Sequence, residues 1–293
     1  MTEKINGVDK EFYDHINYEL EKNEDQLSLC FNETFAENPE NMKYIASKLK
    51  ENKTVKDLTL SGKIGVNTEN VIQLAMILKE NNTIKEMQLS DNKFGLNPEN
   101  MKILSEGIKE NKSIENLGLS HNELGCNSDN LKYLAEGINN KVIKGLYLGT
   151  NELGKNVENM KKLSFALKEN TTIEDLFLEN NCLGENLENM QNLLNGIRTN
   201  NNFRKLSIYG NKIGSNLENV KVISAILKET LIESLTIGEN QIDANVENVR
   251  EFLKGIQENN TLKKLFDGLN LENYEVEDGI FENLKKEKNI SGY

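Results

Sequence analysis

The chain alternates between two spacings of hydrophobic residues. A short run with apolar residues at every second position, such as Met87 and Leu89, is followed by a longer run with apolar residues three and four positions apart, such as Met101, Leu104 and Ile108. The first spacing is typical of a strand with one buried face, and the second of an amphipathic helix. The sequence therefore predicts short strands that alternate with helices.

The two patterns recur together every 29–31 residues. The strand pattern opens in turn at Glu24, Val55, Ile84, Ile114, Ile143, Ile173, Phe203, Ile232 and Leu262. A period of this length is the sequence sign of a solenoid, in which each repeat buries its apolar face only against its neighbours. We expect a cap helix over residues 1–23, eight repeats over 24–261, and a capping strand and helix over 262–293.

The two ends lack the full repeat, as expected of caps that shield a stack from solvent. At the N-terminus, Asp9 is a candidate helix cap, followed by Phe12, Ile16 and Leu20 on one helical face. At the C-terminus, a short closing helix is predicted from Ile280, Phe281 and Leu284. An N-terminal helix that docks onto a partner stays open as an alternative.

An asparagine follows the strand in most repeats, with an apolar residue two positions later. These asparagines are Asn92, Asn122, Asn151, Asn181, Asn211 and Asn240. A buried amide without partners would cost roughly 1–3 kcal/mol, so we expect each to bond to the loop backbone of its own and neighbouring repeats. The second repeat, Leu60-Ser-Gly-Lys-Ile64, is one residue short and lacks the asparagine. A local irregularity is predicted there.

Each helix is preceded by the motif Asn-x-acidic-Asn, from Asn38-P-E-N to Asn245-V-E-N. The first asparagine suits an N-cap, where its side-chain oxygen accepts a backbone N–H. The only two prolines, Pro39 and Pro98, follow this asparagine directly, at the first helical position, where no N–H is needed. The acidic residue then lies near the positive end of the helix dipole.

The pattern L-x-x-L-x-L-x-x-N-x-L-G followed by a helix resembles the leucine-rich repeats of the ribonuclease-inhibitor type, which are also found in NLR receptors and Ran GTPase-activating proteins. The resemblance covers nearly the whole chain, from about Glu24 to Leu265. It implies an α/β solenoid in the shape of a horseshoe arc, with parallel strands on the concave face and helices on the convex face. It does not imply a particular function, because such repeats serve unrelated binding roles.

Composition narrows the classes of partner. The net charge is −12, and arginine occurs only at Arg198, Arg204 and Arg250, so no basic patch for nucleic acid is predicted. No window is apolar enough for a membrane span, and no signal region opens the chain. Cys30, Cys126 and Cys182 form no disulfide or metal pattern, unlike the many cysteines of ribonuclease inhibitor. We expect an acidic, monomeric, cytoplasmic protein without nucleic-acid or membrane partners.

No catalytic, metal-binding or cofactor-binding set can be assembled from the sequence. The two histidines, His15 and His121, lie far apart, and the glycines of the loops belong to the repeat and not to a phosphate-binding motif. Sequons such as Asn111-K-S and Asn170-T-T recur at the turn from helix to strand and are interpreted as turn residues. We therefore expect a non-enzymatic protein that needs no cofactor and no metal.

The residues between the strand leucines are not dictated by the repeat and face the concave side. They form the column Ser28, Thr59, Gln88, Gly118, Tyr147, Phe177, Ser207, Thr236 and Phe266. Most are small or polar, but Tyr147 and Phe177, with Tyr209 two positions further along its strand, predict a diagonal aromatic cluster. Its edge carries Glu179, Asn180 and His121. Exposed aromatic residues are over-represented among interface hot spots, although rings on a sheet also pack on one another.

Two functions follow from these observations. The first is a non-catalytic scaffold that binds a partner protein on its concave face through Tyr147, Phe177, Tyr209, Glu179, Asn180 and His121. Either an intracellular scaffold or an effector delivered into a host cell fits this function. The alternative is a GTPase activator of the Ran type, a family that shares the repeat. Those proteins carry an acidic C-terminal tail, whereas this chain has Lys285-K-E-K near its end.

Overall fold

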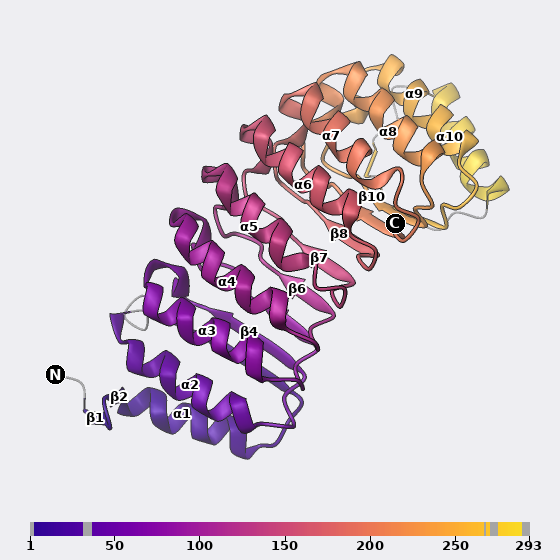
Figure 1. Ribbon diagram of the computed structural model, residues 1–293. Helices are drawn as coiled ribbons and strands as arrows, with labels where there is room; N and C mark the ends of the chain where they lie inside the picture. Colours follow the sequence, from indigo (N-terminus) through magenta and orange to yellow (C-terminus); the bar gives the residue numbers. More distant parts are fainter. Residues whose placement is uncertain (1–2, 32–36, 267, 270–274, 289–293) are drawn as a thin grey trace. The chain divides into compact units, whose positions relative to one another are not determined.

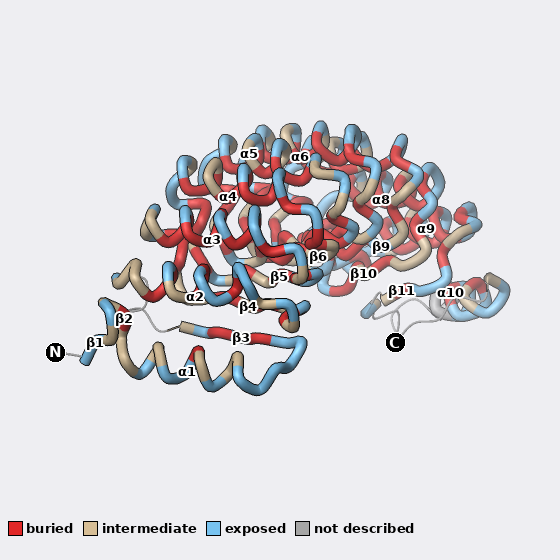
Figure 2. The backbone as a smooth tube through the Cα atoms, turned by 60° about the horizontal axis from the view of Figure 1, so that its bottom comes forward, coloured by how far each residue is buried: buried red, intermediate tan, exposed pale blue. Residues whose placement is uncertain are grey.

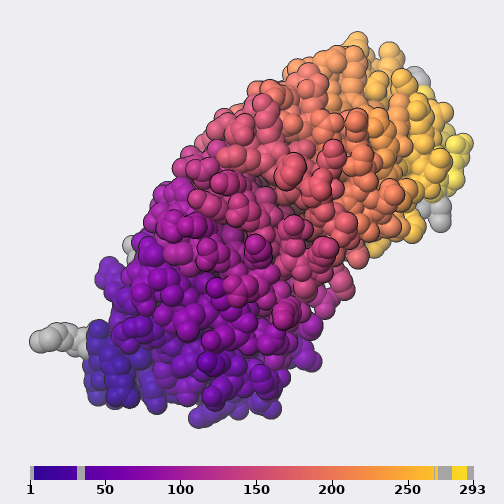
Figure 3. Space-filling model, viewed as in Figure 1, coloured from indigo at the N-terminus to yellow at the C-terminus, as the bar shows by residue number. Residues whose placement is uncertain are grey.

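The computed structural model of the protein describes residues 3–31, 37–266, 268–269 and 275–288. The chain forms two compact units, Met1–Tyr147 and Leu148–Tyr293. Within each unit the strands form one layer and the helices the other (Figure 1). In Figure 3 the consecutive repeats of a unit lie directly beside one another on the surface.

The first unit contains an N-terminal hairpin and five parallel strands. Its elements are β1 (Lys4–Ile5), β2 (Val8–Asp9), α1 (Lys10–Glu21), β3 (Gln26–Cys30), α2 (Pro39–Glu51), β4 (Asp57–Ser61), α3 (Thr68–Glu80), β5 (Glu86–Gln88), α4 (Pro98–Glu110), β6 (Asn116–Gly118), α5 (Ser128–Ile138) and β7 (Gly145–Tyr147). Strands β1 and β2 pair antiparallel, and β3 to β7 pair in chain order.

The second unit continues the same alternation. Its elements are α6 (Val157–Glu169), β8 (Asp175–Phe177), α7 (Leu187–Ile197), β9 (Lys205–Ser207), α8 (Leu217–Glu229), β10 (Ser234–Thr236), α9 (Val246–Glu258), β11 (Lys264–Phe266) and α10 (Glu275–Glu287). Strands β8 to β11 are parallel and also pair in chain order. Between strand and helix, most repeats of both units make a 3₁₀ turn, such as Leu183–Glu185. The α/β class and the parallel strands predicted from the sequence are confirmed.

The core lies between the two layers, where the strand leucines meet the apolar stripe of the helices. Leu58 and Leu60 of β4, for example, are buried, and so are Leu74 and Leu78 of α3. Figure 2 shows buried segments along the inner side of the helices and exposed ones on their outer side. Burial of this alternating set holds the strands in register, because a slip of one residue would expose every leucine.

The asparagine that follows most of the strands connects successive repeats, as predicted, and Asn181 shows how. Asn181 is completely buried. Its Nδ2 donates to the carbonyl of Leu148, 2.9 Å away, and its Oδ1 accepts from the backbone N–H of Asn151, also at 2.9 Å. Its own backbone N–H donates to Oδ1 of Asn211 at 2.9 Å. The amides thus form a continuous ladder within the unit, and the cost of burying them is offset by hydrogen bonds.

The N-cap prediction is confirmed for the repeats. Asn67, for example, accepts from the N–H of Glu69 at 3.0 Å, and Asn245 caps α9 through the N–H of Asn248 at 2.9 Å. The prediction for α1 was wrong. Asp9 occupies the N-cap position but makes no capping hydrogen bond there. Its carboxylate instead accepts from Nδ2 of Asn41, at 2.8 Å.

The glycine of each 3₁₀ turn is required by the close approach of the next repeat. A Cβ added at Gly184 would lie 2.6 Å from the carbonyl carbon of Lys212, and one at Gly65 would lie 2.6 Å from the carbonyl oxygen of Asn92. In the last turn of this kind that the described chain contains, Ile242–Ala244, the glycine is replaced by Asp243.

The irregularity predicted in the second repeat is present. Strand β4 extends over five residues to Ser61, and Gly62 follows with a φ of +130°. A Cβ at Gly62 would come within 2.6 Å of Cβ of Phe31, so only glycine fits. The closing helix α10 buries Phe281 and Leu284 as expected, but Ile280 is 51% exposed. Ile280 therefore lies on the solvent side of α10 and does not help to close the core.

Candidate functional site

The column of residues between the strand leucines has the predicted register within each unit. In the first unit Ser28, Thr59, Gln88, Gly118 and Tyr147 are direct neighbours on β3 to β7. In the second unit the neighbours are Phe177, Ser207, Thr236 and Phe266 on β8 to β11. Because these positions alternate with buried leucines, their side chains lie on the sheet face opposite the helices. We call this the outward strand face.

Four of the predicted site residues come together on the outward strand face of the second unit. Phe177 ends β8, and Glu179 and Asn180 follow it; Tyr209 follows β9. The N–H of Leu178 donates to the carbonyl of Ser207, at 2.8 Å, and the N–H of Asn180 donates to that of Tyr209, at 2.9 Å. Glu179 is therefore the neighbour of Tyr209 on the adjacent strand, and Phe177 is its diagonal neighbour. We call Phe177, Glu179, Asn180 and Tyr209 the second-unit patch.

The patch is accessible from solvent. Tyr209 is 39% exposed, which makes it one of the few large apolar side chains in the described residues that are not covered. Phe177 and Glu179 are half-buried, and Asn180 is exposed. Tyr209 thus keeps part of its ring exposed to solvent, as aromatic residues at binding interfaces do.

Two glycines lie beside Tyr209. Gly210 has a φ of +67°, and a Cβ there would collide with Oδ1 of Asn180, so the amide of Asn180 lies directly over this glycine. Gly238, on the other side of Tyr209, is buried and has no side chain to cover the ring. The N–H of Gly210 donates to the carbonyl of Gly238, at 3.0 Å, which fixes the two backbones side by side.

Two ion pairs lie next to the patch. Lys205 Nζ and Asp175 Oδ2 are 2.6 Å apart at the beginning of β9 and β8. Lys212 Nζ and Glu185 Oε1 are 2.6 Å apart in the loops that follow the patch. The hydrogen bond from Lys212 lowers the pKa of the Glu185 carboxyl from its ordinary value. Burial and the charge of Glu185 raise the pKa of the Cys182 thiol, so this cysteine stays protonated and is a poor nucleophile.

Two predicted site residues belong to the first unit. Tyr147 ends β7 and is half-buried, and His121 is exposed in the turn after β6 with a φ of +56°. The Cε2 atom of Tyr147 would lie 3.3 Å from a Cβ at Gly145, so the ring leans back along its own strand. The grouping of these two residues with the second-unit patch stays a prediction.

Sequence reasoning missed the most exposed large apolar residue that the structure describes. Phe165 of α6 is 68% exposed and lies on the outer helix face. The sequence did contain a signal for this exposure. At the equivalent helix position the neighbouring repeat has Asn195, and others have glutamates such as Glu106, which indicates that the position faces solvent. Phe165 is thus a second candidate contact, on the layer opposite to the patch.

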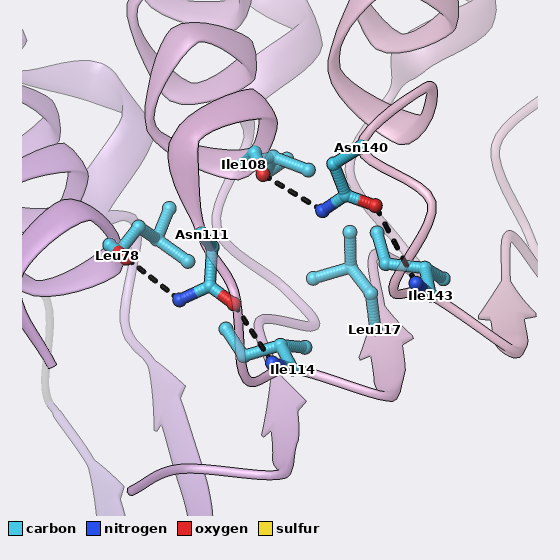
Figure 4. A pocket seen from close by; sticks show the side chains of 7 residues that line it. All are labelled: Leu78, Ile108, Asn111, Ile114, Leu117, Asn140 and Ile143. Atoms are coloured by element: carbon cyan, nitrogen blue, oxygen red, sulfur yellow. Dashed lines mark hydrogen bonds between the residues drawn. The ribbon is translucent and has the colours of Figure 1, made fainter. Parts of the chain in front are cut away.

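A small apolar cavity in the first unit is part of the core and not a ligand site. It is lined by Leu78, Ile108, Asn111, Ile114, Leu117, Asn140 and Ile143, and it leaves no room for a water molecule. Asn111 donates to the carbonyl of Leu78, at 2.6 Å, and accepts from the N–H of Ile114, at 2.7 Å (Figure 4). Asn111 is only 4% exposed, so the interpretation of this sequon as a turn residue is confirmed.

In the described part of the chain, no group of three or more His, Cys, Asp or Glu side chains is arranged to hold a metal ion. None of the helices in the described residues combines the length and the apolar character that a bilayer crossing requires. The thiols of Cys30 and Cys126 are exposed, and that of Cys182 is partly covered.

Comparison with known proteins supports the fold. No family model matches the sequence, and no curated protein matches it either. Among solved structures, the chain is similar to the leucine-rich repeat-containing protein LegL7 from Legionella pneumophila, with 22% sequence identity and a TM-score of 0.63. The match covers 90% of this chain and 81% of LegL7. Together with the strand–helix repeat and the asparagine ladder, this similarity shows that the chain has the leucine-rich-repeat fold.

Proposed function

We propose that the protein is a non-catalytic scaffold that binds a partner protein through the outward strand face, with the second-unit patch as the main contact. The exposure of Tyr209 beside half-buried Phe177 carries this proposal. Both rings stand on a face whose nearest other positions are the small residues Ser207 and Gly238, with Thr236 and Phe266 further along the sheet. Leaving aromatic surface in water is unfavourable, and burial against a partner recovers roughly 25 cal/mol per Å².

The backbone under the patch supports a role in binding. Strands β8 and β9 are held by the parallel ladder and by Asn181, which donates to the carbonyl of Glu179 at 3.2 Å. A surface on rigid strands loses little conformational entropy when a partner docks. We also propose that the protein acts in the cytoplasm of the cell that makes it or of a host cell, where its three thiols stay reduced.

Affinity capture with mass spectrometry tests the proposal. The baits are the wild type, Phe177→Ala/Tyr209→Ala, and Phe165→Ala, in lysate of the source organism and of candidate hosts. Phe165→Ala is a matched control, because it removes an aromatic side chain of the same unit that is more exposed but lies on the helix face. We expect a protein that is captured by the wild type and by Phe165→Ala and is lost with the double variant.

Far-UV circular dichroism and thermal unfolding of all three baits establish that the variants are folded. A partner that the double variant retains and Phe165→Ala loses would overturn the proposal and place binding on the helix face. A double variant that fails to fold would show that the two rings belong to the core.

A further inference from the structure

We propose that the second-unit patch accepts the guanidinium group of an arginine side chain presented by the partner. This inference rests on the proposed function and names the chemistry that the same site recognises. Its starting point is a pair of carboxylates. Glu179 of the patch is half-buried and Glu239, in the next repeat, is exposed, and among the described residues neither makes an ion pair.

Nearby acidic residues behave differently. Asp175, Glu185 and Glu233 each have a lysine Nζ at 2.6 Å, from Lys205, Lys212 and Lys263 respectively. Lys205 begins β9 and lies four residues before Tyr209, which corresponds to roughly 13 Å along an extended strand. These lysines are therefore engaged with carboxylates other than Glu179 and Glu239.

The two carboxylates flank an aromatic ring. On one adjacent strand, Glu179 is the neighbour of Tyr209. On the other, Gly238 is its neighbour, and Glu239 is the next residue after Gly238. Strands lie about 4.8 Å apart, so the carboxylate of Glu179 is within side-chain reach of a group placed on the ring of Tyr209. Glu239 lies one residue further along the other strand and adds negative charge beside the site. The face of an aromatic ring carries negative potential and attracts a cation within about 6 Å of its centroid.

The space above the ring suits a flat group. Gly238 has no side chain there, and Ser207, opposite Phe177, is small and buried, whereas the amide of Asn180 lies over Gly210. A guanidinium group stacks on aromatic faces and binds carboxylates through two parallel hydrogen bonds, whereas an ammonium group is a compact and strongly hydrated charge. Two carboxylates around an accessible ring thus favour arginine over lysine. The net charge of −12 adds a general attraction for basic partners but does not select this site.

Binding of short peptides to the purified full-length chain tests the inference. The probe is a fluorescein-labelled peptide in which three arginines alternate with glycines. Its binding to the protein is measured by fluorescence anisotropy. The same peptide with lysine or with uncharged citrulline in place of arginine provides the comparison. We expect binding in the order arginine, lysine, citrulline, with citrulline at least about tenfold weaker, because it keeps the shape and loses the charge-assisted hydrogen bonds.

Variants locate the site. Glu179→Gln/Glu239→Gln should weaken the arginine peptide about tenfold, and Tyr209→Leu, which keeps apolar area but removes the ring, by about threefold. Glu169→Gln/Glu188→Gln is the matched control, since it changes the net charge equally on exposed positions of α6 and α7. The control should change the affinity by less than about twofold.

Two results would overturn the inference. One is equal weakening by both glutamine pairs, which would mean attraction by net charge alone. The other is an arginine peptide that fails to bind or that binds no better than citrulline. Affinity capture separates this failure from that of the proposed function. A partner that is lost with Phe177→Ala/Tyr209→Ala but kept by Glu179→Gln/Glu239→Gln would support the scaffold role and would exclude recognition of an arginine by the two carboxylates.

Discussion

Lys288 donates a hydrogen bond from its ammonium group to the backbone carbonyl of Asn259, at a distance of 2.6 Å. In an earlier repeat of the same unit, the equivalent carbonyl of Asn170 accepts from Nδ2 of Asn200, at 2.5 Å. Lys288 thus takes the place of a side-chain amide as donor to this carbonyl. The asparagines at the helix ends, such as Asn200 and Asn259, donate to carbonyls of the preceding repeat, so their own carbonyls are left as acceptors toward the C-terminal side.

The opposite arrangement closes the N-terminal end. In later repeats the second asparagine of the helix motif donates to a glycine carbonyl of the preceding repeat, as Asn100 does to Gly65 at 2.8 Å. The first of these asparagines, Asn41, has no such glycine before it and donates to the carboxylate of Asp9, at 2.8 Å. A carboxylate thus accepts from the first asparagine of the helix-motif series, and an ammonium group donates to the carbonyl of Asn259 in the helix-end series.

Removing the donor of Lys288 should loosen the C-terminal end of the second unit. We expect Lys288→Met to lower the free energy of unfolding by about 1–2 kcal/mol, because the carbonyl of Asn259 loses a charged partner in a half-buried place. Urea unfolding followed by circular dichroism measures this effect. Lys286→Met, two positions earlier and exposed, is the control and should be neutral. Equal effects of the two variants would contradict the proposed closing role.

The acceptor of Asp9 should stabilise the N-terminal end of the first unit. Asp9→Ala leaves the buried Nδ2 of Asn41 without this acceptor, at a cost of about 1–3 kcal/mol. Hydrogen exchange should become faster in α1 and at the start of α2. Asp9→Asn keeps an oxygen acceptor and should restore most of the protection, while Asp14→Ala on the exposed face of α1 serves as a control. Unchanged exchange in Asp9→Ala would refute the prediction.

The glycine of the 3₁₀ turn should tolerate no side chain. In Gly184→Ala the new methyl group would meet the backbone of Lys212 and lie 2.8 Å from the carbonyl oxygen of Asn211. Because backbone cannot move aside as a side chain does, we expect a loss of about 1–3 kcal/mol in the free energy of unfolding. Gly279→Ala in α10 is the matched control, since no atom lies within 4 Å of its Cβ position. It should be neutral or slightly stabilising, because alanine favours the helix.

The pH dependence of thiol modification should distinguish Cys182 from the exposed Cys30 and Cys126. Burial and the nearby Glu185 raise the pKa of the Cys182 thiol, so at a given pH a smaller fraction is thiolate, the reactive form. Alkylation by iodoacetamide, followed by peptide mass spectrometry, should be slowest at Cys182, and its rate should keep rising to higher pH. Glu185→Gln removes one cause of the shift and should accelerate the reaction. A rate unaffected by Glu185→Gln would disprove the contribution of that carboxylate.

Much of the fold could be predicted from the sequence because its determinants are local and periodic. The leucine alternation of β4, the N-cap role of Asn67 and the ladder role of Asn181 each depend on residue type and spacing within one repeat. Repeats of nearly equal length then place equivalent residues side by side, so the pairing of Phe177 with Ser207 on adjacent strands could also be predicted. The glycines of the turns were visible in the sequence, but the packing that requires them was not.

Hydrophobic period and side-chain chemistry fix the leucine-rich-repeat fold, the strand columns and the positions of the buried asparagines, so these features could be predicted from the chain alone. The folded molecule was needed to learn which charges are paired, that Asn180 covers Gly210, that Asp9 and Lys288 bond to Asn41 and Asn259, and that Phe165 is exposed. These features join atoms of different repeats, or of a repeat and a terminal segment. Their distances depend on how backbones and rotamers meet in space, which no spacing along the chain specifies.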